Sequence, residues 1–260
     1  MTEKKVEKEV EKEVEKEVEK EETEKKVKPE TEKKAELNTK IMQNNNFITE
    51  IKKKGFQWIN QMLDCKLTYT KPGSISYLIY GEQPSEQSIS IKLGRFGEYL
   101  SKELIEFTPT LQLLTCGVQN VNGKKKDIDL IFKDDTHTII YYFELKANIE
   151  LDTEKIPATV SKCNTIVSSL KEKYSNYNII CGILNWSVFD RKILTTGLSN
   201  IKTFETAGIK IYHMKEFLNI IKVDWDENNY YSYFREIGTK IRTKNANNEP
   251  ASITDKDNNA

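Results

Sequence analysis

Histidine and closely spaced cysteines are scarce in this chain. Among its 260 residues there are 2 histidines and 4 cysteines, and no two cysteines form a CxxC pair. Structural zinc sites need clustered cysteine and histidine ligands, and disulfide-stabilised small folds need a denser cysteine framework. We therefore expect Cys65, Cys116, Cys163 and Cys181 to be free thiols in a reducing compartment.

Long apolar runs and an excess of either charge are also absent. No stretch approaches the roughly 20 apolar residues that span a bilayer, and the N-terminus is charged throughout. The 40 Lys and Arg residues balance 40 Asp and Glu residues, so any nucleic-acid-binding surface has to be local. We expect an intracellular, cytoplasmic protein that does not bind membranes.

The first 40 residues are dominated by an EKEV repeat, which places Val6, Val10, Val14 and Val18 four residues apart. On a helix this period puts like charges at i,i+4, where they repel, and supplies too little apolar surface to fold by itself. Residues 1–40 are therefore predicted to be a disordered or partly helical tail, with a coiled-coil or partner-binding arm as the alternative. The polar end, residues 245–260, is also predicted to be disordered.

The remaining residues, 41–244, alternate between helical and strand patterns, and the folded part is expected to begin near Phe47. Apolar spacing and turn signals predict an ordered series of elements. These are a helix over 47–63, short strands and turns over 66–92, a helix over 94–107, strands over 111–118, 127–132 and 137–147, a helix from an Asp152 N-cap to about 174, strands over 178–186 and 208–214, and helices over 216–223 and 228–244. This order predicts an α/β (α+β) fold with a mixed central β-sheet flanked by helices.

Charged residues occur inside two strands that are otherwise apolar. Asp129 lies near the start of the strand DIDLIF, and Glu144 and Lys146 lie late in the strand HTIIYYFELKA. Burying such groups is costly unless they are paired or bound to a metal. Glu-x-Lys is a common pattern in so glutamate- and lysine-rich a chain, so its placement on an apolar strand carries the interpretation. A salt bridge at the end of the sheet is the alternative.

This combination of residues is suited to phosphodiester hydrolysis, which needs a divalent cation with oxygen ligands. Asp129 and Glu144 are the expected Mg²⁺ ligands, with the carbonyl of Leu145 as a third oxygen, and Mn²⁺ could substitute. Alternation along a strand puts Lys146 on the same face as Glu144. Since a lysine pKa of about 10.4 is too high for a general base, we expect Lys146 to stabilise charge or to orient the water.

An acidic residue on one strand and Glu-x-Lys on the next resemble the PD-(D/E)xK nuclease superfamily, over roughly residues 94–186. The resemblance implies a restriction-endonuclease-like core and makes Glu98, in Gly97-Glu98, a fourth catalytic residue. The family's proline before the aspartate is replaced by Ile128, and Asp127 is a rival to Asp129. The stretch FELKANIELDTEK, GILNW and the last aromatic helix look most like a type II restriction endonuclease.

Other residues have a functional and a structural interpretation. Lys124, Lys125 and Lys126 could grip DNA phosphates or form a solvated hairpin, and Lys155 and Lys162 could contact DNA or the site, although a solvated helix face is the commoner role. The cluster at Tyr230, Tyr231, Tyr233 and Phe234 could stack on bases or form a dimer face, but is predicted to fill a core. His137 and His213 are predicted to be structural.

The sequence thus predicts a Mg²⁺-dependent, site-specific endonuclease that cuts double-stranded DNA as a homodimer, with a DNA methyltransferase protecting the host genome. Two-fold symmetry would let each subunit cut one strand of a palindrome. Two alternatives stay open. One is a structure-selective repair or Holliday-junction nuclease of the same superfamily, and the other is a non-catalytic DNA-binding domain.

Overall fold

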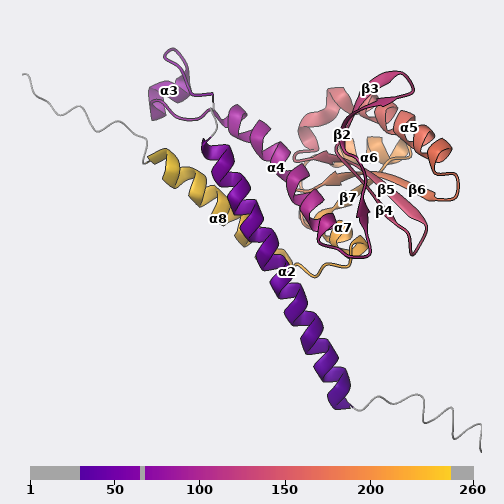
Figure 1. Cartoon of the computed structure of the whole chain (residues 1–260). Helices are drawn as coiled ribbons and strands as arrows, with labels where there is room; N and C mark the ends of the chain where they lie inside the picture. Colours follow the sequence, from indigo (N-terminus) through magenta and orange to yellow (C-terminus); the bar gives the residue numbers. More distant parts are fainter. Residues whose placement is uncertain (1–29, 65–67, 247–260) are drawn as a thin grey trace, which may run out of the picture. The chain divides into compact units, whose positions relative to one another are not determined.

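The computed structural model describes residues 30–64 and 68–246 of the chain (Figure 1). These fall into two compact units, one ending at Asn46 and one beginning at Phe47. The EKEV repeat and residues 247–260 lie outside the described residues. The helix α2 runs from Glu30 to Asp64, so residues 30–40 of the predicted tail are helical.

The unit from Phe47 onward is built on a mixed sheet of five strands. In spatial order these are β1 (Gln112–Leu113), β4 (Leu130–Asp134), β5 (Ile139–Lys146), β6 (Asn178–Asn185) and β7 (Lys210–His213). The pairs β1–β4 and β4–β5 are antiparallel, whereas β5–β6 and β6–β7 are parallel. The predicted mixed central sheet is confirmed.

A separate two-stranded hairpin precedes β4. Its strands, β2 (Gly117–Val121) and β3 (Lys124–Ile128), are joined by Asn122 at φ 50° and Gly123 at φ 77°. Positive φ at both central residues matches the twist of a two-residue hairpin, so the predicted Asn-Gly turn is confirmed. The strands predicted over 111–118 and 127–132 are each divided between the hairpin and the main sheet, which the sequence did not show.

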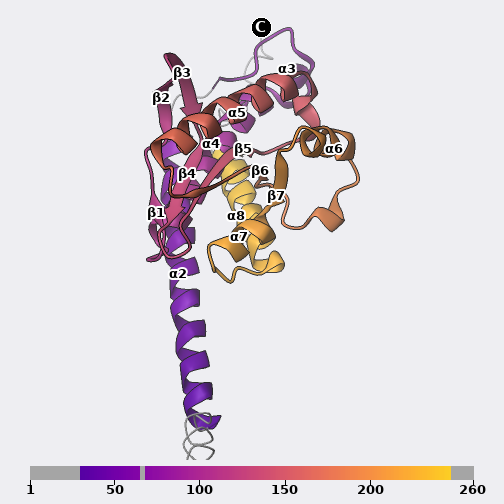
Figure 2. The same cartoon turned by 90° about the vertical axis from the view of Figure 1, so that its right-hand side faces the viewer.

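Helices cover both faces of the sheet (Figures 1 and 2). Their bounds are α3 Ile75–Tyr80, α4 Glu86–Glu106, α5 Ile156–Lys173, α6 Leu198–Thr206, α7 Met214–Ile220 and α8 Glu227–Ala246, with 3-10 helices over Glu150–Lys155 and Arg191–Ile193. One core contains α5 and α6 against Ile140, Tyr142 and Ile183. The other contains the end of α2 with α4, α7 and α8, around Phe132 and Phe143. The result is a three-layer arrangement with one core on each side of the sheet.

The segment 66–92 differs from its prediction of short strands and turns. Over its described part, residues 68–92, the strand pairing is limited to an isolated bridge between Tyr69 and Pro84; α3 fills the middle and α4 begins at Glu86. Two serines explain the difference. Ser74 Oγ accepts from the Tyr77 N–H at 3.1 Å, and Ser85 Oγ accepts from the Ser88 N–H at 3.2 Å, so each caps a helix.

Asp152 is not a helix N-cap, which corrects a second prediction. It lies within the 3-10 helix Glu150–Lys155, and Lys155 is the N-cap of α5. Pro157 nevertheless occupies the first turn of α5, as expected from its fixed φ. The helix α6, in a region with no predicted element, was missed.

The aromatic helix α8 packs into the core, as predicted. Tyr230 and Tyr233 are buried, and the Tyr230 hydroxyl donates to the Trp186 carbonyl at 2.5 Å. Gly55 lies inside α2 because a Cβ at that position would collide with the Tyr233 ring. Over residues 30–64 and 68–246, no helix combines the length and apolar character needed to cross a bilayer.

Candidate active site

Asp129 lies at the junction between the hairpin and the main sheet, immediately after β3 and before β4. Because β4 begins at Leu130, paired with Phe143, the end of β5 extends beyond it. The Asp129 side chain lies beside this unpaired end of β5, where its Oδ2 accepts a hydrogen bond from the Leu145 N–H at 2.8 Å. The break between the two strands therefore directs this carboxylate to the end of β5.

Glu144 is buried on the face of β5 that packs against α5. Its side chain is 8 % exposed. The Tyr142 hydroxyl, two residues earlier on the same face, donates to Glu144 Oε2 at 3.2 Å. Burial and the Glu144 charge raise the pKa of Tyr142, so the hydroxyl keeps its proton and remains a donor.

Lys162 on α5 lies between the two carboxylates. Its Nζ is 2.5 Å from Glu144 Oε2 and 3.6 Å from Asp129 Oδ1. Burial opposes the charged form, but Glu144 and Asp129 together outweigh it and raise the pKa of Lys162. The solvated-face role expected for this lysine is therefore wrong, because its side chain is only 18 % exposed and faces the sheet.

Lys146 joins the group from the end of β5. Its Nζ is 3.6 Å from Glu144 Oε1, and the two side chains share the same face of the strand, as the alternation predicted. The site thus holds two carboxylates and two ammonium groups at the point where the hairpin, β5 and α5 meet.

The two carboxylates repel each other enough to affect protonation. Burial, followed by the charge of Glu144, raises the pKa of Asp129 to about 6, although Lys162 and the Leu145 N–H both oppose the rise. A carboxyl group whose pKa lies this close to neutral pH is typical of functional sites. A cation placed between the carboxylates would favour the ionised form.

Glu98 and Asp127 lie outside this group of four. Glu98, on α4, is 37 % exposed, and its carboxylate lies 3.5 Å from Lys102 Nζ. Its charge nevertheless contributes to the raised pKa of Asp129. Asp127 is exposed on β3, opposite Val118. Its charge contributes to the raised pKa of Lys162.

The donor set can be compared with what Mg²⁺ requires. Within a strand, the N–H and C=O of one residue point to the same side, so the Leu145 carbonyl points toward Asp129. The next carbonyl, of Lys146, points the other way and accepts from the Trp186 N–H at 3.1 Å. Asp129, Glu144 and the Leu145 carbonyl therefore supply three hard oxygen donors, which fit Mg²⁺ or Mn²⁺.

Two findings limit that fit. Among the described residues, no three His, Cys, Asp or Glu side chains form a group that could hold a metal ion. The position between the carboxylates is filled by the Lys162 ammonium. A divalent cation would therefore have to displace or share the position of this lysine.

The remaining candidate lysines do not join the site. Lys124, Lys125 and Lys126 extend along β3 of the hairpin instead of forming its turn, and the first two are exposed. Lys155 is exposed at the N-terminus of α5. They remain candidates for phosphate contact outside the buried group.

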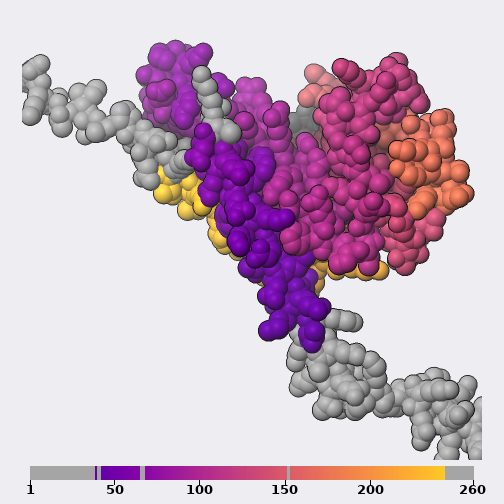
Figure 3. Space-filling model, in the orientation of Figure 1, coloured from indigo at the N-terminus to yellow at the C-terminus, as the bar shows by residue number. Residues whose placement is uncertain are grey.

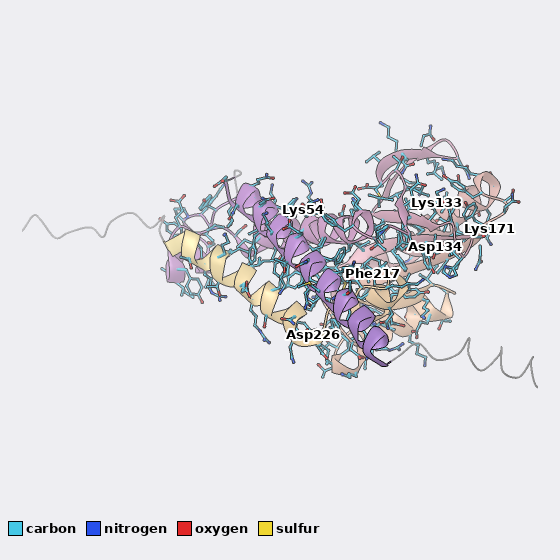
Figure 4. The ribbon with its side chains drawn as sticks, turned by 60° about the horizontal axis from the view of Figure 1, so that its bottom comes forward. Lys54, Lys133, Asp134, Lys171, Phe217 and Asp226 are labelled. Carbon is cyan, nitrogen blue, oxygen red and sulfur yellow. The ribbon has the colours of Figure 1, made fainter. Side chains whose placement is uncertain are left out.

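The two histidines are paired with carboxylates other than Asp129 and Glu144. His137 Nδ1 is 2.6 Å from Asp134 Oδ2 in the turn before β5, at the far end of that strand from Glu144; Asp134 is labelled in Figure 4. His213 is buried at the end of β7, and its ring nitrogens have no hydrogen-bond partner among the described residues. Burial lowers its pKa, which favours the neutral ring. Three cysteines, at 116, 163 and 181, are free thiols, and Cys65 lies outside the described residues.

The sequence offered Lys162 only as a possible contact to DNA or to the site, and it did not predict that Lys162 lies between the two carboxylates, although a signal for this position exists. The buried residues of α5 include Thr159, Cys163 and Ile166, and Lys162 falls three residues after the first and four before the last. A lysine on the apolar stripe of a helix faces the core and needs a buried acidic partner.

No protein-family model, curated protein or solved structure matches this chain.

Proposed function

We propose that this protein is a metal-dependent nuclease of the PD-(D/E)xK type. The supporting observation is the pair formed by the half-buried Asp129 and the buried Glu144 beside Lys146, at the end of the strand that carries Glu-x-Lys. The pKa of about 6 for Asp129 supports a site that gains from binding a cation.

Each residue has a distinct role in this proposal. Asp129, Glu144 and the Leu145 carbonyl would hold Mg²⁺, which, when bound, supplies Lewis acidity and lowers the pKa of a water molecule. Lys146 lies close enough to orient that water or to offset charge on the phosphate. Tyr142 fixes the Glu144 carboxylate through its hydrogen bond.

The finer assignment follows the resemblance to type II restriction endonucleases. The substrate would be double-stranded DNA cut at specific sites inside the cell, with a DNA methyltransferase protecting the host. The exposed lysines of β3 would contact phosphates beside the site.

The first test is cleavage of mixed-sequence plasmid DNA by the purified protein with Mg²⁺ or Mn²⁺. We expect discrete fragments, and no cleavage when EDTA is present. Cleavage of branched DNA alone would favour the repair-type nuclease. Intact DNA under all these conditions would contradict nuclease function.

A non-catalytic domain is the second candidate, favoured by one observation. Lys162 already neutralises the carboxylates, as it would in a purely structural ion-pair network. In that case divalent cations would not stabilise the fold. A bound metal, in contrast, raises the free energy of unfolding by about 2.7 kcal/mol at 100 times its Kd.

Lys162→Met separates the two candidates. Loss of the ammonium leaves the carboxylates unbalanced and should destabilise the fold by about 3–5 kcal/mol. In the nuclease, Mn²⁺ would recover this loss, because the metal replaces the missing positive charge. We expect that recovery in thermal unfolding measured with and without Mn²⁺.

The matched control is Lys171→Met, on the same helix but exposed and labelled in Figure 4. It should lose little stability, and Mn²⁺ should stabilise it no more than the wild type. If Mn²⁺ fails to stabilise the wild type and Lys162→Met alike, the structural interpretation holds.

A further inference from the structure

The helix α3 exposes almost all of its apolar side chains. None of its six residues is buried. Ile75, Leu78, Ile79 and Tyr80, which we call the α3 patch, are between 61 and 83 % exposed. Figure 3 shows this helix protruding at the upper left of the surface. Contiguous apolar surface of this kind on a folded protein marks a binding surface.

Hydrogen bonds hold α3 in place from both sides. The Thr70 N–H donates to the Gln83 carbonyl at 2.8 Å, and the Thr70 hydroxyl donates to the Gly81 carbonyl at 2.8 Å. Ser74 caps the first turn. Since the loop is closed at its base, the patch is presented in a fixed shape before any partner binds, which lowers the entropy cost of association.

The area of the patch suits a protein partner. If each large side chain offers about 200 Å² when fully exposed, the four leave roughly 570 Å² of surface per molecule. Two copies in contact would bury at most roughly 1,100 Å², which is close to the lower limit of about 1,200 Å² for specific protein–protein interfaces.

The charge pattern favours a second copy over other partners. Residues 72–81 contain no charged residue, although 31 % of the chain is charged, and Lys71 and Glu82 flank them. DNA and anionic membranes would both need basic side chains within the surface. In a two-fold contact, side chains near the axis meet their own copies, so uncharged residues avoid repulsion between like charges.

We propose that α3 is a dimerisation element whose patch packs against the same patch of a second copy of this chain. The contact is isologous, with Leu78, the most exposed member at 83 %, closest to its centre. This assignment depends on the exposure, area and charge of the patch and is independent of whether the protein cuts DNA.

Sedimentation equilibrium of the full chain, with no metal or DNA, tests the proposal. The chain mass is 30.2 kDa, and we expect twice that mass at micromolar concentration. The double variant Ile75→Glu, Leu78→Glu places repelling charges across the axis and should weaken dimerisation at least 100-fold. Its circular dichroism should match the wild type, because neither side chain packs in the core.

Val118→Glu is the matched control, since Val118 is 68 % exposed on the hairpin, outside α3. It should dimerise like the wild type. A monomeric wild type at 100 µM would overturn the proposal, and so would a double variant that dimerises normally. Loss of DNA or vesicle binding in the double variant of a monomeric protein would assign the patch to that partner instead.

Discussion

Asp129 is half-buried next to a second carboxylate, and this position raises its pKa. Burial and the Glu144 charge raise its pKa to about 6, above the ordinary value of 3.8. Ionised Asp129 therefore opposes folding at neutral pH, since its folded pKa exceeds its unfolded one. A lower free energy of unfolding without the ligand is what a cation-binding site would show, because a bound cation would restore that free energy.

Asp129→Asn should stabilise the metal-free protein at pH 8 by about 3 kcal/mol, which is the free energy that the raised pKa represents. The amide oxygen can still accept from the Leu145 N–H, while the repulsion from Glu144 disappears. Below pH 6 the folded wild type takes up a proton on Asp129 that the unfolded chain binds only near pH 3.8, so the advantage of the variant should shrink steeply between pH 6 and pH 4 and disappear below the unfolded pKa. Urea unfolding in EDTA at pH 8, 6 and 4 measures this trend.

Asp135→Asn is the control for that series. Asp135 is exposed in the turn before β5 and lies 2.8 Å from Lys133 Nζ. Its hydrogen bond with Lys133 lowers its pKa, so removing its charge should bring no gain in stability at pH 8. A gain of equal size in both variants would show that general charge, and not the Asp129 site, sets the effect.

At the scale of elements, the close contact of α4 with the end of β6 depends on Gly97. A Cβ at this position would overlap the Trp186 ring, whereas one at Gly94, a turn earlier on α4, would meet nothing within 4 Å. The contact keeps α4, which carries Glu98, against the sheet. Glycine is otherwise a poor choice inside a helix.

Gly97→Ala should destabilise the protein by about 2 kcal/mol, because either α4 or Trp186 has to move. Gly94→Ala should instead stabilise it by about 0.5–1 kcal/mol through the better helix propensity of alanine. Chemical unfolding of both variants measures the difference. Equal effects at the two positions would contradict the packing role of Gly97.

Most elements were predictable because their local patterns agree with their final environment. The Asn122-Gly123 turn and the apolar run of β6 are examples. The segment holding α3 was not predictable, because its alternation of Ile75, Tyr77 and Ile79 imitates a strand. Among the described residues no strand pairs with this segment, so the Ser74 cap and local helix formation prevail.

At the scale of the whole molecule, the site is assembled by topology. Asp129, Glu144 and Lys146 were predictable from charges on apolar strands, and the structure brings Glu144 close to Lys146. Lys162 comes from a helix that follows β5 and packs back on the sheet. The direction in which the Lys162 side chain points depends on how α5 packs on the sheet. The apolar periodicity of a sequence predicts such packing only coarsely.

The most direct test of a nuclease centre is the rate of plasmid cleavage by Glu144→Gln in Mg²⁺, compared with wild type and Asp135→Asn. The glutamine keeps the size of the side chain and removes the charge that would hold the metal. We predict a loss of at least about 100-fold for Glu144→Gln and a wild-type rate for Asp135→Asn. A folded Glu144→Gln that cuts DNA at the wild-type rate would contradict the assignment.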